Sequence, residues 1–296
     1  MNKIILPHLL DAAIPTIHVV DVGAMVEGEE RYHKLIEHGL ARVTGFEPDE
    51  TQHKMLSERT GPYTYLPLFL GNGQEACFHL ARYPGCSSLL CPDPAVIDLF
   101  QTIGCADPEG NFHIQKQLTV RTTQMDNVED LAAIDLLKLD IQGYELEVLK
   151  HATQSLKNTL VIESEVEFLA LYKDQPLFGD LQCFLRDQGF VLHKLIDLSG
   201  RPFKPFLPQN PYVPMSQLLW GDAVFVRDFT KLELLDDDSL LKTFAILDLV
   251  YDSCDLAGLY LQELDKRNGT LWLQNYWTKL QTRSLNLYCA NIKQHP

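Results

Sequence analysis

The feature that most constrains the fold is an alternation, from residue 17 to about residue 165, of apolar runs of strand length with stretches of helical period. This alternation is typical of βα units around a parallel sheet. We therefore predict a Rossmann-like, doubly wound α/β domain with a mostly parallel seven-stranded sheet and an antiparallel edge strand. The expected strands cover 17–23, 41–48, 64–71, 135–143, 158–168, 190–197 and 217–228, and the expected helices cover 28–40, part of the 50s, 144–156 and 177–188.

Two segments depart from this pattern and define the predicted domain organisation. Residues 72–125 are rich in proline and glycine, which predicts inserted loops and short strands within a main domain of residues 1–230. Residues 231–296 have helical period and no strand pattern, so we expect a helical C-terminal extension. Three roles remain open for this extension: packing on the core, covering the active site, or forming a homo-oligomer interface.

The composition narrows the classes of partner and the cellular location. A net charge of −15 without a run of Lys and Arg disfavours a nucleic-acid partner. Apolar runs fall short of the roughly 20 residues of a membrane span, and Pro7 and Asp11 interrupt the N-terminal apolar stretch, so we expect a mature cytoplasmic protein. The seven cysteines form no CxxC pair and are expected to be reduced and structural: Cys77, Cys86, Cys91, Cys105, Cys183, Cys254 and Cys289.

Candidate binding residues follow the predicted strands, because ligands of doubly wound sheets collect at the carboxyl ends of the strands. Asp21 and Gly23 end the first strand in the motif DVGA, where a glycine allows close approach to a ligand. Glu47 ends the second strand in FEPD and could accept hydrogen bonds from both hydroxyls of a ribose. Asp140 lies near the end of the fourth strand.

The first turn discriminates between two nucleotide cofactors that Glu47 could hold. A dinucleotide enzyme needs GxGxxG there to surround a pyrophosphate with backbone N–H groups, whereas this chain has the acidic sequence GAMVEGEE. That turn suits the sulfonium cation and zwitterionic tail of S-adenosylmethionine. The sequence therefore favours S-adenosylmethionine over NAD, with a dinucleotide-dependent oxidoreductase as the alternative.

Six motifs carry a resemblance to the FkbM-type methyltransferases across about residues 17–228: VVDVGA, VTGFEPD, YPGCSSL, LLKLDIQGYELEVLKHA, ESEVEFLALYKDQPLF and LLWGDAVFVRD. The resemblance implies the class I methyltransferase fold, S-adenosylmethionine as methyl donor, and O-methylation of a hydroxyl on a sugar, glycan or secondary metabolite. It implies that Asp21, Gly23 and Glu47 bind the donor and that Ser87 and Ser88 lie near the donor or acceptor. We add to the donor-binding set Ala24 and Pro48 from the same motifs, and Gln142 at the start of the helix after the fourth strand.

Methyl transfer to a hydroxyl needs a group that removes its proton. Period-2 alternation places Lys138 and Asp140 on one face of their strand, and Glu163 and Glu165 on one face of the next. We expect Asp140 to be the base or to orient the acceptor, with Glu163 and Glu165 as alternates. In the opposing interpretation Lys138 and Glu163 form a structural ion pair and Asp140 caps a helix.

Three further alternatives stay open. Asp140, Glu163 and Glu165 could hold a magnesium-type ion, although no diagnostic ligand spacing supports a metal site. Of the histidines, only His113 in the insertion is considered near an acceptor, and a surface or core role is favoured for it. A non-catalytic protein that uses its helical tail to bind a partner is a third function class.

Overall fold

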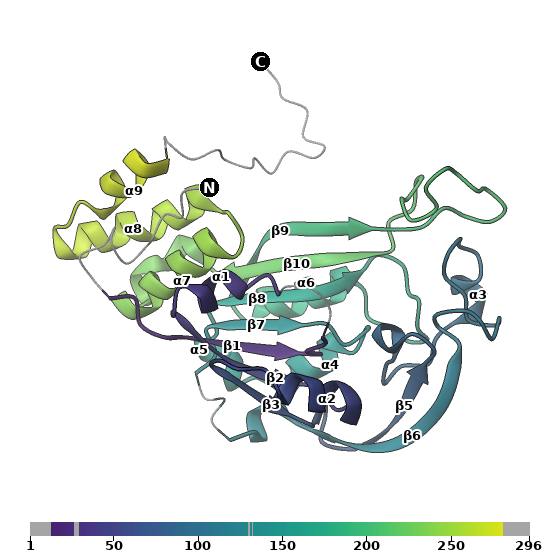
Figure 1. The fold of residues 1–296 in the computed structure, drawn as a ribbon. Coiled ribbons are helices and arrows are strands. Elements are labelled where there is room, and N and C mark those ends of the chain that lie inside the picture. Colours follow the sequence, from purple (N-terminus) through teal and green to yellow (C-terminus); the bar gives the residue numbers. More distant parts are fainter. Residues whose placement is uncertain (1–12, 27–29, 130, 132, 281–296) are drawn as a thin grey trace. The chain divides into compact units, whose positions relative to one another are not determined.

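A computed structural model describes residues 13–26, 30–129, 131 and 133–280. Its main sheet has seven strands in the order β3-β2-β1-β7-β8-β10-β9 (Figure 1). These strands are β1 (Ile17–Val22), β2 (Ala41–Phe46), β3 (Tyr63–Leu66), β7 (Leu136–Leu139), β8 (Val161–Glu167), β9 (Phe190–Ser199) and β10 (Trp220–Arg227). The strand order reverses between β1 and β7, which is where doubly wound sheets bind their ligands. The predicted fold class is confirmed.

The direction of the strands agrees with a mostly parallel sheet. β1 pairs in parallel with β7, as do β7 with β8 and β2 with β3. β10 runs antiparallel to both β8 and β9, so the reversed strand lies one position inside the edge and β9 forms the edge.

Several elements are shorter than the sequence pattern suggested, for local reasons. Pro67 has no backbone N–H for a ladder, and the expected strand over 64–71 divides there into β3 and β4 (Phe69–Leu70). β7 ends at Leu139, and Gln142 and Gly143 then take positive φ angles of 59° and 95°. The helix expected over 28–40 is only α1 (His33–Glu37) among the described residues.

The region expected to hold inserted loops and short strands forms a separate three-stranded sheet with the order β4-β6-β5. Its longer strands are β5 (Glu75–Ala81) and β6 (Ile114–Thr123), which pair antiparallel. Short helices η2 (Pro84–Cys86), α3 (Pro94–Ile97) and η3 (Met125–Asn127) accompany them.

Leucine side chains at helical spacing pack short helices against the main sheet. The helices between strands of the main sheet include α2 (Glu50–Ser57), α4 (Glu145–Lys150), α5 (Ser155–Asn158) and α6 (Phe178–Asp187). The predicted inward side chains Leu146, Leu149 and Leu156 are confirmed as buried, at 6%, 0% and 1% exposure. Each such side chain contributes about 1.5–3 kcal/mol through burial, so the sheet and not helix propensity holds these short helices in place.

The chain divides into two compact units. One comprises residues 17–28 and 42–229, which include the ten strands found in the described residues apart from Ala41, and the other combines residues 1–16, 29–41 and 230–296. The second unit contains α1, most of η4 (Phe229–Leu234), α7 (Asp237–Leu249), α8 (Cys254–Asn268) and α9 (Trp272–Leu280). Residues 281–296, with Cys289, lie outside the described residues.

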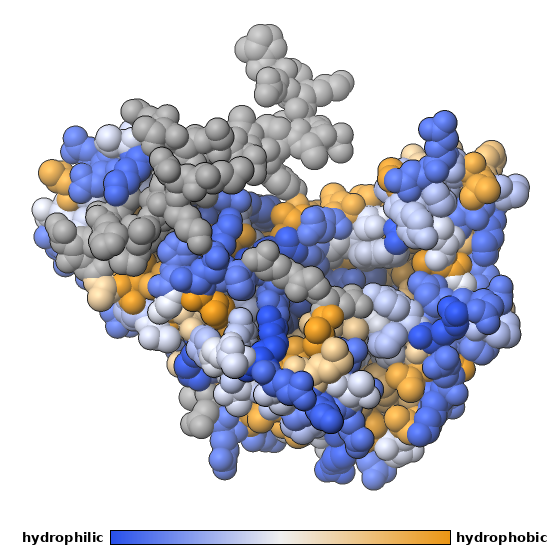
Figure 2. Space-filling model, viewed as in Figure 1, coloured by the Kyte–Doolittle hydropathy of each residue, from blue (hydrophilic) through white to orange (hydrophobic). Residues whose placement is uncertain are grey.

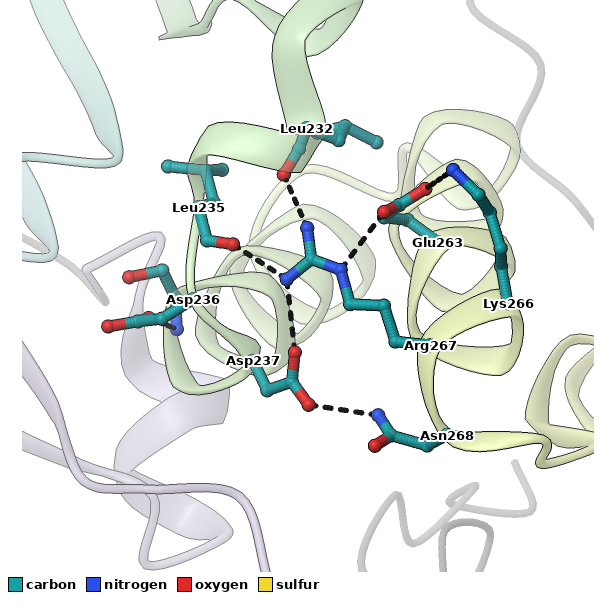
Figure 3. A network of polar contacts seen from close by, with 9 residues as sticks. Leu232, Leu235, Asp236, Asp237, Glu263, Lys266, Arg267 and Asn268 are labelled. Carbon is teal, nitrogen blue, oxygen red and sulfur yellow. Dashed lines mark hydrogen bonds and ion pairs between the residues drawn. The ribbon is translucent and has the colours of Figure 1, made fainter.

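Polar contacts around Arg267 connect the helices of the second unit (Figure 3). Its guanidinium donates to the carbonyl oxygens of Leu232 and Leu235 at 2.9 and 2.7 Å and to the carboxylates of Glu263 and Asp237 at 2.9 and 3.1 Å. α8 ends beside it at Asn268, and the next residue, Gly269, has a φ of +68°, the left-handed conformation typical of a helix C-terminus. One planar cation therefore satisfies two backbone oxygens before α7 and joins α7 to α8.

Within the described part of the chain, no helix combines the length and apolarity that crossing a membrane requires.

Candidate active site

Three strand ends meet at the turn that follows β1. The backbone N–H groups of Gly23 and Ala24 both donate to the carbonyl oxygen of Phe46 at the end of β2, at 3.0 and 3.1 Å. The N–H of Asp140, just after β7, donates to Val22 O at 2.9 Å. Gly23 has a φ of +88°, and a Cβ there would lie 1.9 Å from the carbonyl oxygen of Asp140. Only glycine permits this approach, which brings the ends of β1, β2 and β7 together at the switch point.

Glu47 is a buried carboxyl at the end of β2. It is 6% exposed, and its Oε1 accepts a hydrogen bond from the N–H of Asp49 at 2.7 Å. Burial raises the pKa of Glu47 to about 7; the Asp49 N–H opposes this shift, and the negative charges of Asp49 and Asp21 add to it. Because burial disfavours the ionised form, hydrogen-bond donors on a ligand would stabilise the carboxylate. Pro48, next in the motif, is half-buried.

Lys138 lies between carboxylates on neighbouring strands. Asp21 on β1 and Glu163 on β8 are its register partners, so all three side chains lie on one face of the sheet. The Lys138 Nζ is 3.2 Å from Asp21 Oδ1 and 3.9 Å from Asp140 Oδ2. Burial lowers the pKa of the Lys138 ammonium, but the charges of Asp21, Asp140 and Glu163 outweigh burial and hold the pKa above its ordinary value. Lys138 therefore forms ion pairs with Asp21 and, at a longer distance, with Asp140, and the charge of Glu163 also acts on it.

One side-chain amide joins two of the predicted catalytic carboxyls. The Nε2 of Gln142 donates to Asp140 Oδ1 at 3.1 Å and to Glu165 Oε2 at 2.6 Å. The Asp140 side chain remains 41% exposed, so a ligand can reach it. The structure thus brings Asp140, Gln142 and Glu165 together at the ends of β7 and β8.

Two residues from outside the main sheet contact Gln142. Ser88 Oγ, after η2, donates to the backbone oxygen of Gln142 at 2.7 Å. Tyr172 Oη lies 2.9 Å from the carbonyl oxygen of Cys86 and 3.3 Å from Gln142 Oε1, so its one proton is shared between these two acceptors. The insertion therefore contacts the turn that carries the candidate base.

Two buried carboxyls, Glu145 and Glu167, and the partly buried Glu165 lie near the same turn. Glu145, 2% exposed, accepts from the N–H groups of Ile141 and Gly143 at 2.9 and 3.1 Å, and burial raises its pKa to about 7. Burial, followed by the charges of neighbouring carboxyls, also raises the pKa values of Glu165 and Glu167 well above their ordinary range. Burial and these neighbouring charges favour the neutral form of the Glu165 carboxyl, which is a hydrogen-bond donor and a weaker base than the carboxylate.

The remaining predicted site residues have local partners. Ser87 Oγ accepts from the N–H of Ala81 at the end of β5, at 3.0 Å. His113 Nδ1 is 3.2 Å from Cys105 O, within the insertion. Among the described residues, no group of three or more His, Cys, Asp or Glu side chains is arranged to hold a metal ion.

Sequence reasoning missed Tyr172, Glu145 and Glu167. Glu167 follows Glu163 and Glu165 at period 2 in β8, so extending the alternation by one step would have found it. Glu145 begins α4, where an acidic residue at a helix N-terminus ordinarily indicates a solvated first turn. No local pattern marks Tyr172, whose role depends on a contact 30 residues away in the sequence.

A loop with exposed apolar side chains connects the edge strand β9 to its neighbour β10. Residues 200–219 connect β9 to β10, and Trp220 at the start of β10 pairs with Glu167 at the end of β8. Two backbone hydrogen bonds join this loop to the insertion. The N–H of Gln101 in the insertion donates to Pro202 O in the loop, and the N–H of Lys204 in the loop donates to Leu99 O in the insertion. Its most exposed large apolar residues are Phe206, Leu207, Tyr212, Val213 and Met215, at 53–74% exposure. Figure 2 shows apolar patches among hydrophilic residues on the visible face.

Comparison with known proteins identifies one family. The family model described as the methyltransferase FkbM domain matches residues 21–192, more than half of the chain. A solved structure described as a "putative methyltransferase" from Thermoplasma acidophilum is similar at 12% sequence identity and a TM-score of 0.34, covering 72% of this chain and 69% of the other. No curated protein matches the sequence.

Proposed function

Because the chain belongs to the FkbM methyltransferase family, we propose that it transfers the methyl group of S-adenosylmethionine to a hydroxyl of a sugar, glycan or secondary metabolite. The observation that carries the proposal is the meeting of Gly23, Glu47 and Asp140 at the point where the strand order reverses. Doubly wound sheets bind nucleotide ligands at that point.

The residues at the ends of β1 and β2 fit the proposed donor. The buried Glu47 has one carboxyl oxygen bonded to the Asp49 N–H, and ribose hydroxyls would stabilise its ionised form. We assign Asp21, Gly23, Ala24, Glu47 and Pro48 to donor binding, because they surround the same strand ends. When bound, S-adenosylmethionine supplies an electrophilic methyl group on a sulfonium.

The acceptor is proposed to bind beside Asp140. A hydroxyl near this carboxylate can pass its proton to Oδ1 or Oδ2 as the oxygen attacks, and general-base help of this kind is worth about 10²–10⁴-fold in rate. Asp140 suits the role better than the other candidates, because its side chain is 41% exposed, whereas Glu163 is 3% exposed and the surroundings of Glu165 raise the pKa of that carboxyl well above its ordinary value. Ser88 contacts the backbone of Gln142, and we propose that Ser87, Ser88 and the loop over 200–219 shape the acceptor site.

The pKa of Glu47 gives the proposal a pH signature. A raised carboxyl pKa destabilises the unliganded protein increasingly as the pH rises from about 4.5 to about 7, where the buried group ionises. The affinity for a ribose that binds only the ionised form of Glu47 should follow the opposite trend and increase as the pH rises. Between pH 6 and pH 8 the ionised fraction rises from about one tenth to about nine tenths, so affinity for S-adenosylhomocysteine should rise roughly tenfold, measured by isothermal titration calorimetry.

The matched control for this prediction is Glu47→Gln, which keeps the size of the side chain and removes its titration. The variant should bind S-adenosylhomocysteine at least about tenfold more weakly at pH 8, because a hydrogen bond to a charged group is lost. Its affinity should not change between pH 6 and pH 8 by the factor seen in the native protein. A native affinity independent of pH, together with tight binding by the variant, would remove Glu47 from the donor site.

A further inference from the structure

Gln142 has an unfavourable backbone conformation that its contacts maintain. Its φ of +59° lies in the left-handed region, which a residue with a long side chain rarely adopts. Gly143 follows with φ of +95°, so two consecutive residues turn the chain between β7 and α4. Such outliers persist where the surroundings over-determine them, and they cluster at functional sites.

The contacts of Gln142 come from four separate parts of the unit. Its Nε2 reaches Asp140 after β7 and Glu165 on β8, its Oε1 accepts from Tyr172, and its backbone oxygen accepts from Ser88 in the insertion. The two protons of one amide therefore bridge two carboxyls, and the Tyr172 hydroxyl lies at the oxygen end of the amide. The orientation of Asp140 depends on this bridge.

We propose that Gln142 is a positioning residue that holds the exposed carboxyl of Asp140 at a fixed place relative to Glu165, so that Asp140 faces the acceptor hydroxyl. This inference rests on the proposed function for its chemical meaning. It differs from the expectation that Gln142 binds the methyl donor, because both polar atoms of its side chain already have protein partners.

The carboxyl of Glu165 provides a readout that does not need the acceptor. Asp140, Glu145, Glu167 and Asp222 all act on its charge, and each is left in place by a change at residue 142. Replacing Gln142 by glycine removes the Nε2 donor while it suits the left-handed backbone. Since an N–H donor favours the ionised form, its loss should move the titration of Glu165 upward by about one pH unit.

The experiment follows carboxyl ¹³C resonances by NMR in protein labelled at Asp and Glu, with the Glu165 signal assigned through Glu165→Gln. In Gln142→Gly we expect the upward shift of the Glu165 titration and a displaced Asp140 carboxyl resonance. Affinity for S-adenosylhomocysteine should stay within about twofold of the native value. Tyr172→Phe, which frees one end of the amide, should give a smaller shift in the same direction.

Thr102→Gly is the matched control for backbone strain, because Thr102 is exposed, lies in the insertion and has a φ of +60°. It should relieve the same kind of left-handed backbone strain without moving either carboxyl resonance. An unchanged Glu165 titration in Gln142→Gly would overturn the inference, as would a tenfold loss of S-adenosylhomocysteine affinity. If the native protein fails to bind S-adenosylhomocysteine while the carboxyl shift appears, the proposed function falls and the bridge stands.

Discussion

Gly23→Ala should lower the free energy of unfolding by about 3 kcal/mol or more and abolish measurable binding of S-adenosylhomocysteine. Two costs combine at this position: left-handed φ strain of about 1–2 kcal/mol and an overlap that costs about 1–3 kcal/mol. The overlap is with backbone, 1.9 Å from Asp140 O, so no side-chain rotation relieves it. The ends of β1 and β7 must separate, and this displaces both the donor turn and the candidate base. Urea denaturation and calorimetric titration measure the two effects.

Gly39→Ala provides the comparison, because it has the strain without the overlap. Its φ is +66°, and a Cβ there meets nothing within 4 Å. We expect a loss of only about 1 kcal/mol and native affinity for S-adenosylhomocysteine. Equal losses of stability in the two variants would show that the contact between the β1 turn and Asp140 is unimportant.

Lys138→Met should destabilise the protein by about 3 kcal/mol at neutral pH. Removing one partner of a buried ion pair costs about 3–5 kcal/mol, and the 23% exposure of the Lys138 side chain argues for the lower end. The change removes an ammonium 3.2 Å from Asp21, which is itself only 2% exposed, and leaves Asp21, Asp140 and Glu163 to repel one another. The midpoint of urea denaturation reports the loss.

A second substitution separates the charge effect from packing. The double variant Lys138→Met/Asp21→Asn also removes the charge of the buried Asp21, which Lys138→Met leaves without its cation. Most of the lost stability should therefore return. Lys150→Met, which breaks a half-exposed pair with Glu147 at 3.8 Å, should change stability by less than about 1 kcal/mol. If the double variant is no more stable than Lys138→Met, the loss comes from packing and the electrostatic account is wrong.

Periodicity predicted the sheet well because the apolar strands report burial directly. The same alternation placed Lys138 and Asp140 on one face, but β7 ends at Leu139, so Asp140 belongs to the turn. Register across strands is not visible in a single strand, which is why the sequence suggested Glu163 and the structure shows Asp21 as the partner within hydrogen-bond distance of Lys138. Knowing that β7 lies between β1 and β8 would have indicated both register partners of Lys138, which are Asp21 and Glu163.

The sequence named most of the candidate site but not how its residues are connected. DVGA and FEPD identified Gly23 and Glu47, because a turn glycine and a carboxylate at a strand end have local meanings. The bridge through Gln142 depends on Ser88 and Tyr172, which are 54 and 30 residues away and reach the turn only through the insertion and the segment after β8. Long-range contacts of this kind leave no periodic pattern.

The most direct test of the central claim is calorimetric titration of the protein with S-adenosylhomocysteine and, separately, with NADH. We predict that S-adenosylhomocysteine binds and NADH does not, because the first turn suits a zwitterionic amino-acid tail and not a pyrophosphate. Binding of NADH without binding of S-adenosylhomocysteine would contradict the account and favour a dinucleotide-dependent enzyme on the same fold.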